Sequence, residues 1–287
     1  MDRMGERSPE AFQQKACKES VLKMIRLIAV DMDGTMLNDD SEITNRTKAA
    51  VQKAASSDVL FVVATGRAMR GVEDINRLFE KDLPFITLNG AFVVMGKTRK
   101  VLMNKRLDMT LAKEVYDLGH HRDIPMVIWT GERFWASREC EAISNYGKIY
   151  DMDYETINNL DDLGRTDISK LLWFGTPESI TRYSQEMNIH FAGRLNCHAS
   201  RPKFLEFVGS DTDKGSALAE IGKIYGIESS EMIAVGDSYN DISMLKYAGL
   251  GIAMENAADE VKAVCGQTTQ SNNNDGVAAV IEEYVLG

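Results

Sequence analysis

The stretch IRLIAVDMDGT at residues 25–35 decides the fold that we predict for this chain. Residues 25–30 are apolar except for Arg26, and a short run of this kind predicts a strand buried on both faces, as in a parallel sheet. Asp31 and Asp33 follow at its carboxyl end, where open α/β sheets carry their sites. Two carboxylates this close resist being ionised together. We therefore expect a bound cation, a proton or a phosphate-handling role to relieve their repulsion. An acidic turn without chemistry explains the stretch equally well when it is taken alone.

Further strands and helices follow in alternation. Residues 59–64 and 84–87 are apolar runs that predict two more buried strands. Helices are predicted over residues 45–55, where Thr44 or Asn45 can act as N-cap, and over residues 69–79. This alternation predicts an α/β fold with a doubly wound, mostly parallel, Rossmann-like core sheet.

The pattern changes after about residue 94. Hairpins are predicted over residues 92–102 and 125–136, and they are mixed with helices, as in an α+β layer. Strand–helix alternation returns with a helix over residues 214–225 and a strand over residues 232–235. The chain is therefore predicted to hold a poorly ordered N-terminal extension at 1–23, a core at 24–93 and 208–287, and an inserted α+β cap at 94–207.

Polar side chains follow the predicted strands. Thr65-Gly66-Arg67 offers a hydroxyl and free N–H groups to an oxyanion, although an ordinary strand-to-helix turn is the simpler interpretation. Lys214 opens a helix against the helix dipole, which suggests a bound anion, although a solvated lysine is equally compatible. Because open α/β sheets gather strand ends into one crevice, these groups are expected to meet there. They are Asp31, Asp33, Thr65, Lys214, Asp237 and Asp241.

This set of residue types indicates phosphoryl chemistry. It holds several carboxylates, one lysine and one hydroxyl, but no histidine or cysteine. Clustered hard oxygen ligands suit Mg²⁺, which prefers a few carboxylates together with water and substrate phosphate. The added lysine and threonine complete a phosphoryl site. Since the chain lacks a Gly-x-x-x-x-Gly-Lys-Ser/Thr loop, a carboxylate is the most economical nucleophile, with an aspartyl-phosphate as intermediate.

Composition limits the partners. The chain of 287 residues is long enough for one core with a substantial insertion. A formal net charge of −10 argues against nucleic acid or an anionic membrane, and no apolar run approaches the ~20 residues of a membrane span. The cysteines form no Cys-x-x-Cys pair, so a reduced cytoplasm fits best. They are Cys17, Cys140, Cys197 and Cys265.

Four stretches, taken in order, resemble the four motifs of the haloacid dehalogenase-like phosphatases. They are Asp31-Met32-Asp33-Gly34-Thr35, Thr65-Gly66-Arg67, Lys214-Gly215 and Gly236-Asp237-Ser238-Tyr239-Asn240-Asp241. The large insert, with Asn89-Gly90-Ala91 before it and Asp275-Gly276-Val277-Ala278 near the end, is similar to the Cof-type branch. The resemblance covers the chain from about Met24 to the C-terminus. Met36 stands where Leu is commoner, a mild departure that changes no expected role.

The resemblance implies a role for each matching residue. Asp31 would be the nucleophile and a Mg²⁺ ligand. Asp33 would protonate the leaving alcohol, later activate water, and bind the metal through its carbonyl oxygen. Asp237 would complete the protein's share of the Mg²⁺ ligands, with Asp241 supporting it. The phosphate would be held by Thr65, Lys214, Asn240 and the backbone amides of Met32 and Gly66, while Asn89 and Gly90 would reach toward the domain cleft.

The sequence thus predicts a cytoplasmic, Mg²⁺-dependent phosphatase for a small phosphorylated metabolite, a sugar phosphate or related monoester. It is expected to be a monomer or a weak homo-oligomer with no nucleic-acid or membrane partner. A phosphomutase or phosphoryl-transferase would use the same site and differ only in the acceptor. A receiver-type, non-enzymatic phospho-acceptor protein also uses clustered Asp and a Lys, but the large insert and Thr65 argue against it.

Overall fold

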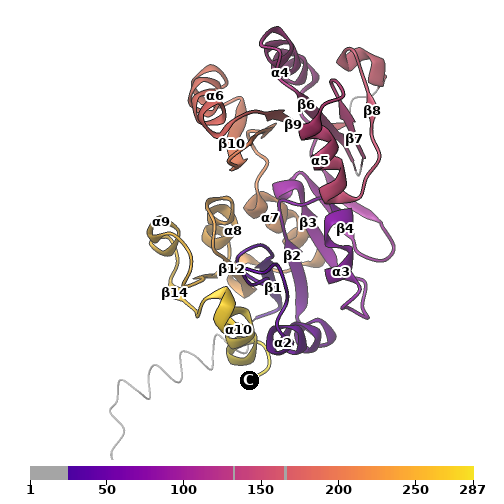
Figure 1. The fold of residues 1–287 in the computed structure, drawn as a ribbon. Helices are drawn as coiled ribbons and strands as arrows, with labels where there is room; N and C mark the ends of the chain where they lie inside the picture. Colours follow the sequence, from indigo (N-terminus) through magenta and orange to yellow (C-terminus); the bar gives the residue numbers. More distant parts are fainter. Residues whose placement is uncertain (1–24, 132, 165–166) are drawn as a thin grey trace, which may run out of the picture. The chain divides into compact units, whose positions relative to one another are not determined.

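The computed structural model describes residues 25–131, 133–164 and 167–287 (Figure 1). The N-terminal extension predicted at residues 1–23 lies outside the described residues. The chain forms two compact units, and their boundaries fall between Phe61 and Val62 and between Ile221 and Gly222. In the part of the chain that the structure describes, no helix has the length and apolar character required to cross a membrane.

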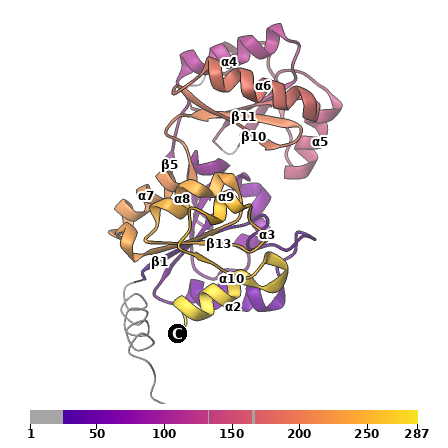
Figure 2. The same ribbon diagram turned by 90° about the vertical axis from the view of Figure 1, so that its left-hand side faces the viewer.

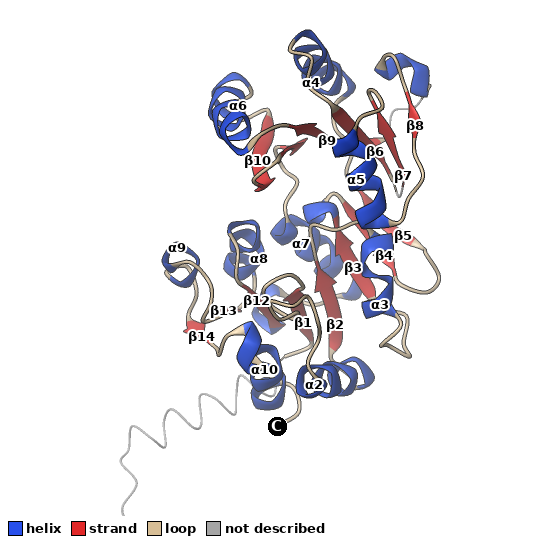
Figure 3. Cartoon of the chain, in the orientation of Figure 1, coloured by secondary structure: helices blue, strands red, loops and turns tan. Residues whose placement is uncertain are grey.

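The first unit is built around parallel strands in the order β14-β13-β12-β1. Its helices α2 and α10 lie side by side (Figures 1 and 2). Figure 3 separates its strands from its helices by colour. The bounds are β1 Leu27–Asp31, α2 Asn45–Ser56, β12 Met232–Gly236, α8 Ile242–Tyr247, β13 Leu250–Ala253, α9 Asp259–Lys262, β14 Gln267–Thr268 and α10 Gly276–Tyr284.

Strand register places two of the expected functional loops together. All five residues of β1 are buried, as the apolar run predicts. Leu27 pairs with Met232 and Val30 with Val235 in parallel, so β1 and β12 end at the same edge. Asp31 and the loop after Gly236 therefore start at neighbouring strand ends.

The second unit contains strands in the order β2-β3-β4-β5, followed in the chain by a second sheet. Strand β3 pairs in parallel with β2 and antiparallel with β4. The hairpin of β4 and β5 thus continues the sheet of β3, whereas the sequence analysis assigned it to the start of the insert. The bounds are β2 Leu60–Ala64, which begins in the first unit, α3 Glu73–Asn76, β3 Pro84–Thr87, β4 Phe92–Met95, β5 Val101–Asn104 and α7 Lys214–Tyr225, which ends in the first unit.

The second sheet has six strands in the order β10-β11-β9-β6-β7-β8. Neighbouring strands are antiparallel from β10 to β7. Helices α4 and α6 lie on one face of this sheet and α5 on the other (Figure 2). The bounds are α4 Met109–His121, β6 Met126–Thr130, β7 Arg133–Ala136, α5 Glu141–Tyr150, β8 Glu155–Thr156, β9 Ile168–Phe174, α6 Pro177–His190, β10 Leu195–Arg201 and β11 Phe204–Gly209.

The mostly parallel sheet with helices, together with a separate mixed sheet, confirms the predicted fold class. Two helices differ from the prediction. The helix expected over residues 69–79 is broken into a 3₁₀ turn at Met69–Val72 and α3, because Val72 has φ −128° and ψ 13° directly after Gly71. Helix α5 was not predicted, since Cys140 at its N-cap makes no side-chain hydrogen bond and gives no start signal.

Candidate active site

Three carboxylates meet at the carboxyl ends of β1 and β12. Asp31, Asp237 and Asp241 each place one carboxylate oxygen within 4.8 Å of the others. Asp31 is 5% exposed and Asp241 is fully buried. Like charges held this close are unfavourable unless a cation joins them. A donor set made only of carboxylate oxygens fits a hard divalent cation such as Mg²⁺.

Neighbouring groups hold these carboxylates in place. The Thr35 hydroxyl donates to Asp237 Oδ1 at 2.7 Å, and the Ser238 hydroxyl donates to Asp237 Oδ2 at 2.9 Å. The backbone N–H groups of Asp237 and Ser238 donate to Asp241 Oδ2 at 3.0 and 2.9 Å. Asp241 therefore fixes the turn that carries Asp237.

Gly34 brings the loop after β1 against this cluster. Its φ is +77°, a conformation that side chains with a Cβ rarely adopt. A Cβ at this position would lie 2.7 Å from Asp237 Oδ2. The Gly34 carbonyl also accepts from the Asn256 side chain at 2.8 Å. The loop thus has room for glycine only.

The remaining candidates of the first unit lie on the same two loops. Asp33 is exposed and forms an isolated bridge with Leu37, and its side chain is not one of the three clustered carboxylates. Met32 is 1% exposed, and its carbonyl accepts from the N–H of Leu37 at 2.9 Å. Asn240 is exposed in the 3₁₀ turn after β12.

In the second unit, Thr65 lies at the end of β2 and is fully buried. Its N–H donates to the Ile86 carbonyl at 2.8 Å, and its hydroxyl accepts from the Arg67 N–H at 3.1 Å. The Asn89 N–H donates to the Thr65 carbonyl at 3.1 Å. A Cβ on Gly66 would lie 2.9 Å from Asn89 Oδ1, so the loops after β2 and β3 touch closely.

Lys214 lies in the same unit as these loops, at the first position of α7, and is fully buried. Gly90 has φ +95°, and a Cβ there would lie 2.1 Å from the Asp213 carbonyl oxygen and 3.0 Å from the backbone nitrogen of Lys214. The loop after β3 therefore packs directly on the start of α7. The partial positive charge of a helix N-terminus opposes an ammonium there, so this position is favourable for negative charge.

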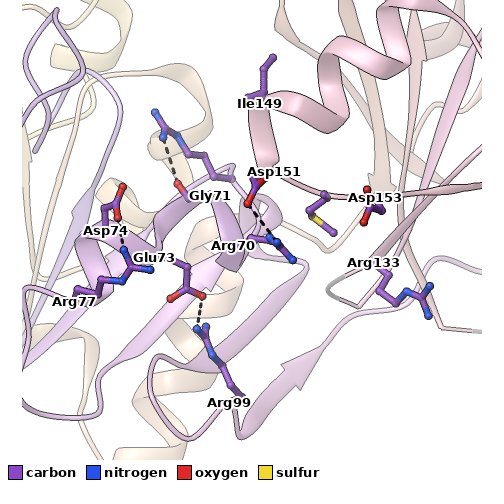
Figure 4. Close-up of a pocket in the computed structure, with 12 residues that line it drawn as sticks. Arg70, Gly71, Glu73, Asp74, Arg77, Arg99, Arg133, Ile149, Asp151 and Asp153 are labelled. Carbon is purple, nitrogen blue, oxygen red and sulfur yellow. Dashed lines mark hydrogen bonds and ion pairs between the residues drawn. The ribbon is translucent and has the colours of Figure 1, made fainter.

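The second unit also has a pocket of about 890 Å³ that contains several arginines (Figure 4). Most of their charge is neutralised by acids of the same pocket. Arg70 pairs with Asp151 at 3.4 Å and Arg77 with Asp74 at 2.9 Å, and Arg99 pairs with Glu73. Such exposed pairs contribute little energy, and we assign this pocket no role.

A polar cluster that was not predicted from the sequence lies on the six-stranded sheet beside Asn89. Lys170 and Glu206 lie within strands whose other residues are mostly apolar, and they are 1% and 5% exposed. The signal was available, because a charged residue inside a buried strand requires a partner. The partner itself depends on strand pairing, which the sequence does not reveal.

Comparisons with known proteins agree with this architecture. A family model described as haloacid dehalogenase-like hydrolase matches residues 28–281. YcsE of Bacillus subtilis (strain 168), named a 5-amino-6-(5-phospho-D-ribitylamino)uracil phosphatase, is 30% identical over 263 residues, which cover 91% of this chain and 96% of YcsE. YwtE of the same organism, which carries the same activity name, is 28% identical over 288 residues, covering 92% and 99%.

Solved structures show the same fold. TM0651 from Thermotoga maritima has a TM-score of 0.79 and 29% identity, and the match covers 90% of this chain and 97% of that one. A haloacid dehalogenase-like hydrolase from Bacteroides thetaiotaomicron has a TM-score of 0.78 and 26% identity, covering 90% and 98%. The chain belongs to the haloacid dehalogenase-like hydrolases, in their Cof-type branch, and it is a phosphatase.

Proposed function

We propose that this phosphatase hydrolyses a small phosphate monoester with the help of Mg²⁺, through an aspartyl-phosphate formed on Asp31. The observation that carries the proposal is the cluster of Asp31, Asp237 and Asp241, a set of three carboxylate oxygens within 4.8 Å of one another. Such a cluster favours a bound divalent cation. It also holds a carboxylate nucleophile at the end of a rigid strand.

We further propose that the two sets of loop residues act on one phosphate group. In the second unit, the buried Thr65 hydroxyl, the Gly66 N–H and the Lys214 ammonium would bind its oxygens. In the first unit, the Met32 N–H and the Asn240 side chain would do the same. The close contacts of Asn89 and Gly90 with these loops support this assignment, because they fix the loops that carry the donors.

The reaction would then have two steps. A carboxylate oxygen of Asp31 attacks phosphorus, the bond from phosphorus to the leaving oxygen breaks, and Asp33 gives that oxygen its proton. Water then attacks phosphorus while Asp33 takes a proton from it, which releases phosphate and restores the Asp31 carboxylate. The exposure of Asp33 supports this role, since it must exchange protons in both steps.

A Mg²⁺ ion held by the carboxylates of Asp31, Asp237 and Asp241 and by the Asp33 carbonyl would offset negative charge between nucleophile and substrate. The Lys214 ammonium would add a second positive charge that offsets the negative charge of the substrate phosphate. Without this compensation, one anion would have to attack another.

The segment that carries the six-stranded sheet is proposed as the cap that selects the substrate, with bounds near 94–207. The named activities of YcsE and YwtE support a small phosphorylated metabolite, since both names describe a phosphate monoester on a ribityl chain. The free cysteines Cys140, Cys197 and Cys265 support a reduced cytoplasm as the place of the reaction.

The test is phosphate release from para-nitrophenyl phosphate and glucose 6-phosphate by metal-depleted protein, before and after Mg²⁺ is added. Activity should appear only with Mg²⁺ and should be lost in Asp31→Asn. The matched control is Asp259→Asn, which changes an exposed carboxylate on α9. Full activity after metal depletion would refute the Mg²⁺ dependence. Phosphate transfer to an added alcohol, in place of release to water, would indicate a phosphoryl-transferase.

A further inference from the structure

The loop after β1 folds back on itself beside Asp33. Asp33 and Leu37 form a backbone bridge, so the residues between them make a tight turn. We call residues 31–37 the acid loop. The Thr35 hydroxyl ties the acid loop to Asp237 at 2.7 Å. This bond restrains a side chain, whereas the direction of the loop backbone depends on contacts with its own carbonyl groups.

Two asparagines from the C-terminal part of the chain hold carbonyl groups of the acid loop. Asn256 Nδ2 donates to the Gly34 carbonyl at 2.8 Å, and Asn272 Nδ2 donates to the Leu37 carbonyl at 3.1 Å. Asn256 follows β13, Asn272 follows β14, and both belong to the first unit, as the acid loop does. Gly34 comes directly after Asp33, so the bond from Asn256 restrains the backbone next to the proposed acid.

The two asparagines are joined to each other and to Asp39. The Asn272 N–H donates to Asn256 Oδ1 at 3.0 Å, which orients the Asn256 amide with its Nδ2 toward Gly34. Asn272 Nδ2 also donates to Asp39 Oδ1 at 3.0 Å, and Asn273 Nδ2 donates to Asp39 Oδ2 at 2.8 Å. Hydrogen bonds to a carboxylate are stronger than those between neutral groups. A continuous set of bonds therefore runs from Asp39 through Asn272 and Asn256 to Gly34.

Folding stability explains these two asparagines poorly. Asn256 is exposed, so water can replace its hydrogen bonds and their net contribution to stability is small. Asn272 is 4% exposed, and its Oδ1 is buried without a hydrogen-bond partner among the described residues. A buried acceptor left in this way costs free energy, and proteins retain such costs at functional sites. What the pair does fix is the position of the acid loop.

The role proposed for Asp33 requires such support. Strand β1 ends at Asp31, so Asp33 lies beyond the rigid part of the sheet. A general acid or base must come within about 2.6–3.2 Å of the atom that gives or takes the proton. Misplacement by about 1 Å can lower the rate by about 10²-fold. A loop that has to meet this tolerance depends on surrounding groups that lock its position.

We propose that Asn256, oriented by Asn272, is a positioning residue that aligns Asp33 for proton transfer. This rests on the proposed function, in which Asp33 protonates the leaving oxygen and later takes a proton from water. Asn256 acts through the Gly34 carbonyl and the backbone of the acid loop. Its loss therefore affects the proton-transfer steps more than the binding of phosphate.

The experiment compares kcat/KM for phenyl phosphate and para-nitrophenyl phosphate at saturating Mg²⁺. The two esters are similar in shape, but phenolate is the stronger base and needs a proton to leave, whereas nitrophenolate leaves without one. In Asn256→Ala, the ratio of kcat/KM for phenyl phosphate to that for para-nitrophenyl phosphate should fall by about tenfold. Asp33→Asn is measured beside it and gives the ratio in the absence of the acid.

The matched control is Asn274→Ala. The Asn274 side chain is exposed, and its Nδ2 donates to Ser271 Oγ at 2.9 Å within the same turn as Asn272. The ratio should stay at the wild-type value in this variant. Asn272→Ala should lower the ratio in the same direction as Asn256→Ala, since it removes the group that orients the Asn256 amide.

Thermal unfolding reports whether each variant folds, and the exposed position of Asn256 keeps the test decisive if the buried Asn272→Ala does not. A wild-type ratio in Asn256→Ala, together with a lowered ratio in Asp33→Asn, would overturn the positioning role. An equal loss of activity toward both esters, the result expected of a purely structural residue, would overturn it as well. An unchanged ratio in Asp33→Asn, or no hydrolysis of either ester by the wild-type protein, would instead overturn the proposed function.

Discussion

At the scale of single residues, the site depends on groups that are positioned by their neighbours. Asp237 accepts hydrogen bonds from Thr35 and Ser238, and Asp241 accepts from two backbone N–H groups. Partners of this kind orient metal ligands and affect metal affinity when they are removed. The acid cluster should therefore be sensitive to changes that leave the carboxylates themselves intact.

Gly34 offers the sharpest test of this dependence. Gly34→Ala should destabilise the fold by about 1–2 kcal/mol through its positive φ, and it should also displace Asp237. We expect the Mg²⁺ affinity, measured by calorimetry, to fall by about tenfold or more. Gly226→Ala is the matched control, because Gly226 has φ +62° and a Cβ there would meet no described atom within 4 Å. Equal Mg²⁺ affinities in the two variants would show that Asp237 does not depend on Gly34.

His198 gives a prediction for pH. Its pKa is lowered from 6.5 in the folded protein, first by burial and then by Lys170, with Glu206 opposing. The unfolded chain therefore binds more protons just below pH 6.5, and stability is lost as the pH falls from 6.5 toward the lowered pKa. The difference in unfolding free energy between the wild-type protein and His198→Gln should change in that window and stay constant above it. A constant difference throughout would contradict the shift.

At the scale of secondary-structure elements, most strands follow from the sequence because each is a short apolar run. Strand β1 is buried at every position, as predicted. Helix α5 gave no start signal, and the break at Val72 depends on a local backbone conformation that no residue pattern reveals. The hairpin of β4 and β5 was placed in the wrong layer because its pairing with β3 is a tertiary contact.

In the candidate site too, local sequence patterns predict some features, and tertiary contacts set the others. The carboxylates of Asp31, Asp237 and Asp241 could be expected at one place because they follow parallel strands. The contact of Lys170 with Glu206 could not be expected, because these residues are far apart in the sequence and meet only through the pairing of β9 with β11. Strand order is set by packing of the whole sheet, which a single run of residues does not encode.

The six-stranded sheet should depend on its buried layer beside α4 and α6. Leu205→Ala on β11 removes a fully buried side chain, so it should lower the free energy of unfolding by about 2–5 kcal/mol. Ile189→Ala on α6 is the control, since Ile189 is 80% exposed and its truncation should cost less than about 0.5 kcal/mol. Chemical denaturation of both variants provides the measurement. Equal losses would contradict the packing of this layer.

At the scale of the whole molecule, we propose that residues of both compact units take part in one reaction. In that proposal, the first unit would supply the carboxylates of Asp31, Asp237 and Asp241, and the second would supply Thr65 and Lys214. The core residues would carry out phosphoryl transfer, and the cap would contact the alcohol that leaves. Interactions with the part of the substrate that does not react can then raise selectivity without altering the chemical step.

The central claim is that Asp31 becomes phosphorylated during turnover. The most direct measurement is mass spectrometry of the peptide containing Asp31, taken from Asp33→Asn that was mixed with substrate and quenched in acid. Because this variant lacks the group that activates water, the account predicts slow turnover and a peptide heavier by one phosphoryl group, with the modification on Asp31. Asp31→Asn treated in the same way should carry none. An unmodified peptide from Asp33→Asn despite measurable turnover would contradict the account and indicate direct attack by water.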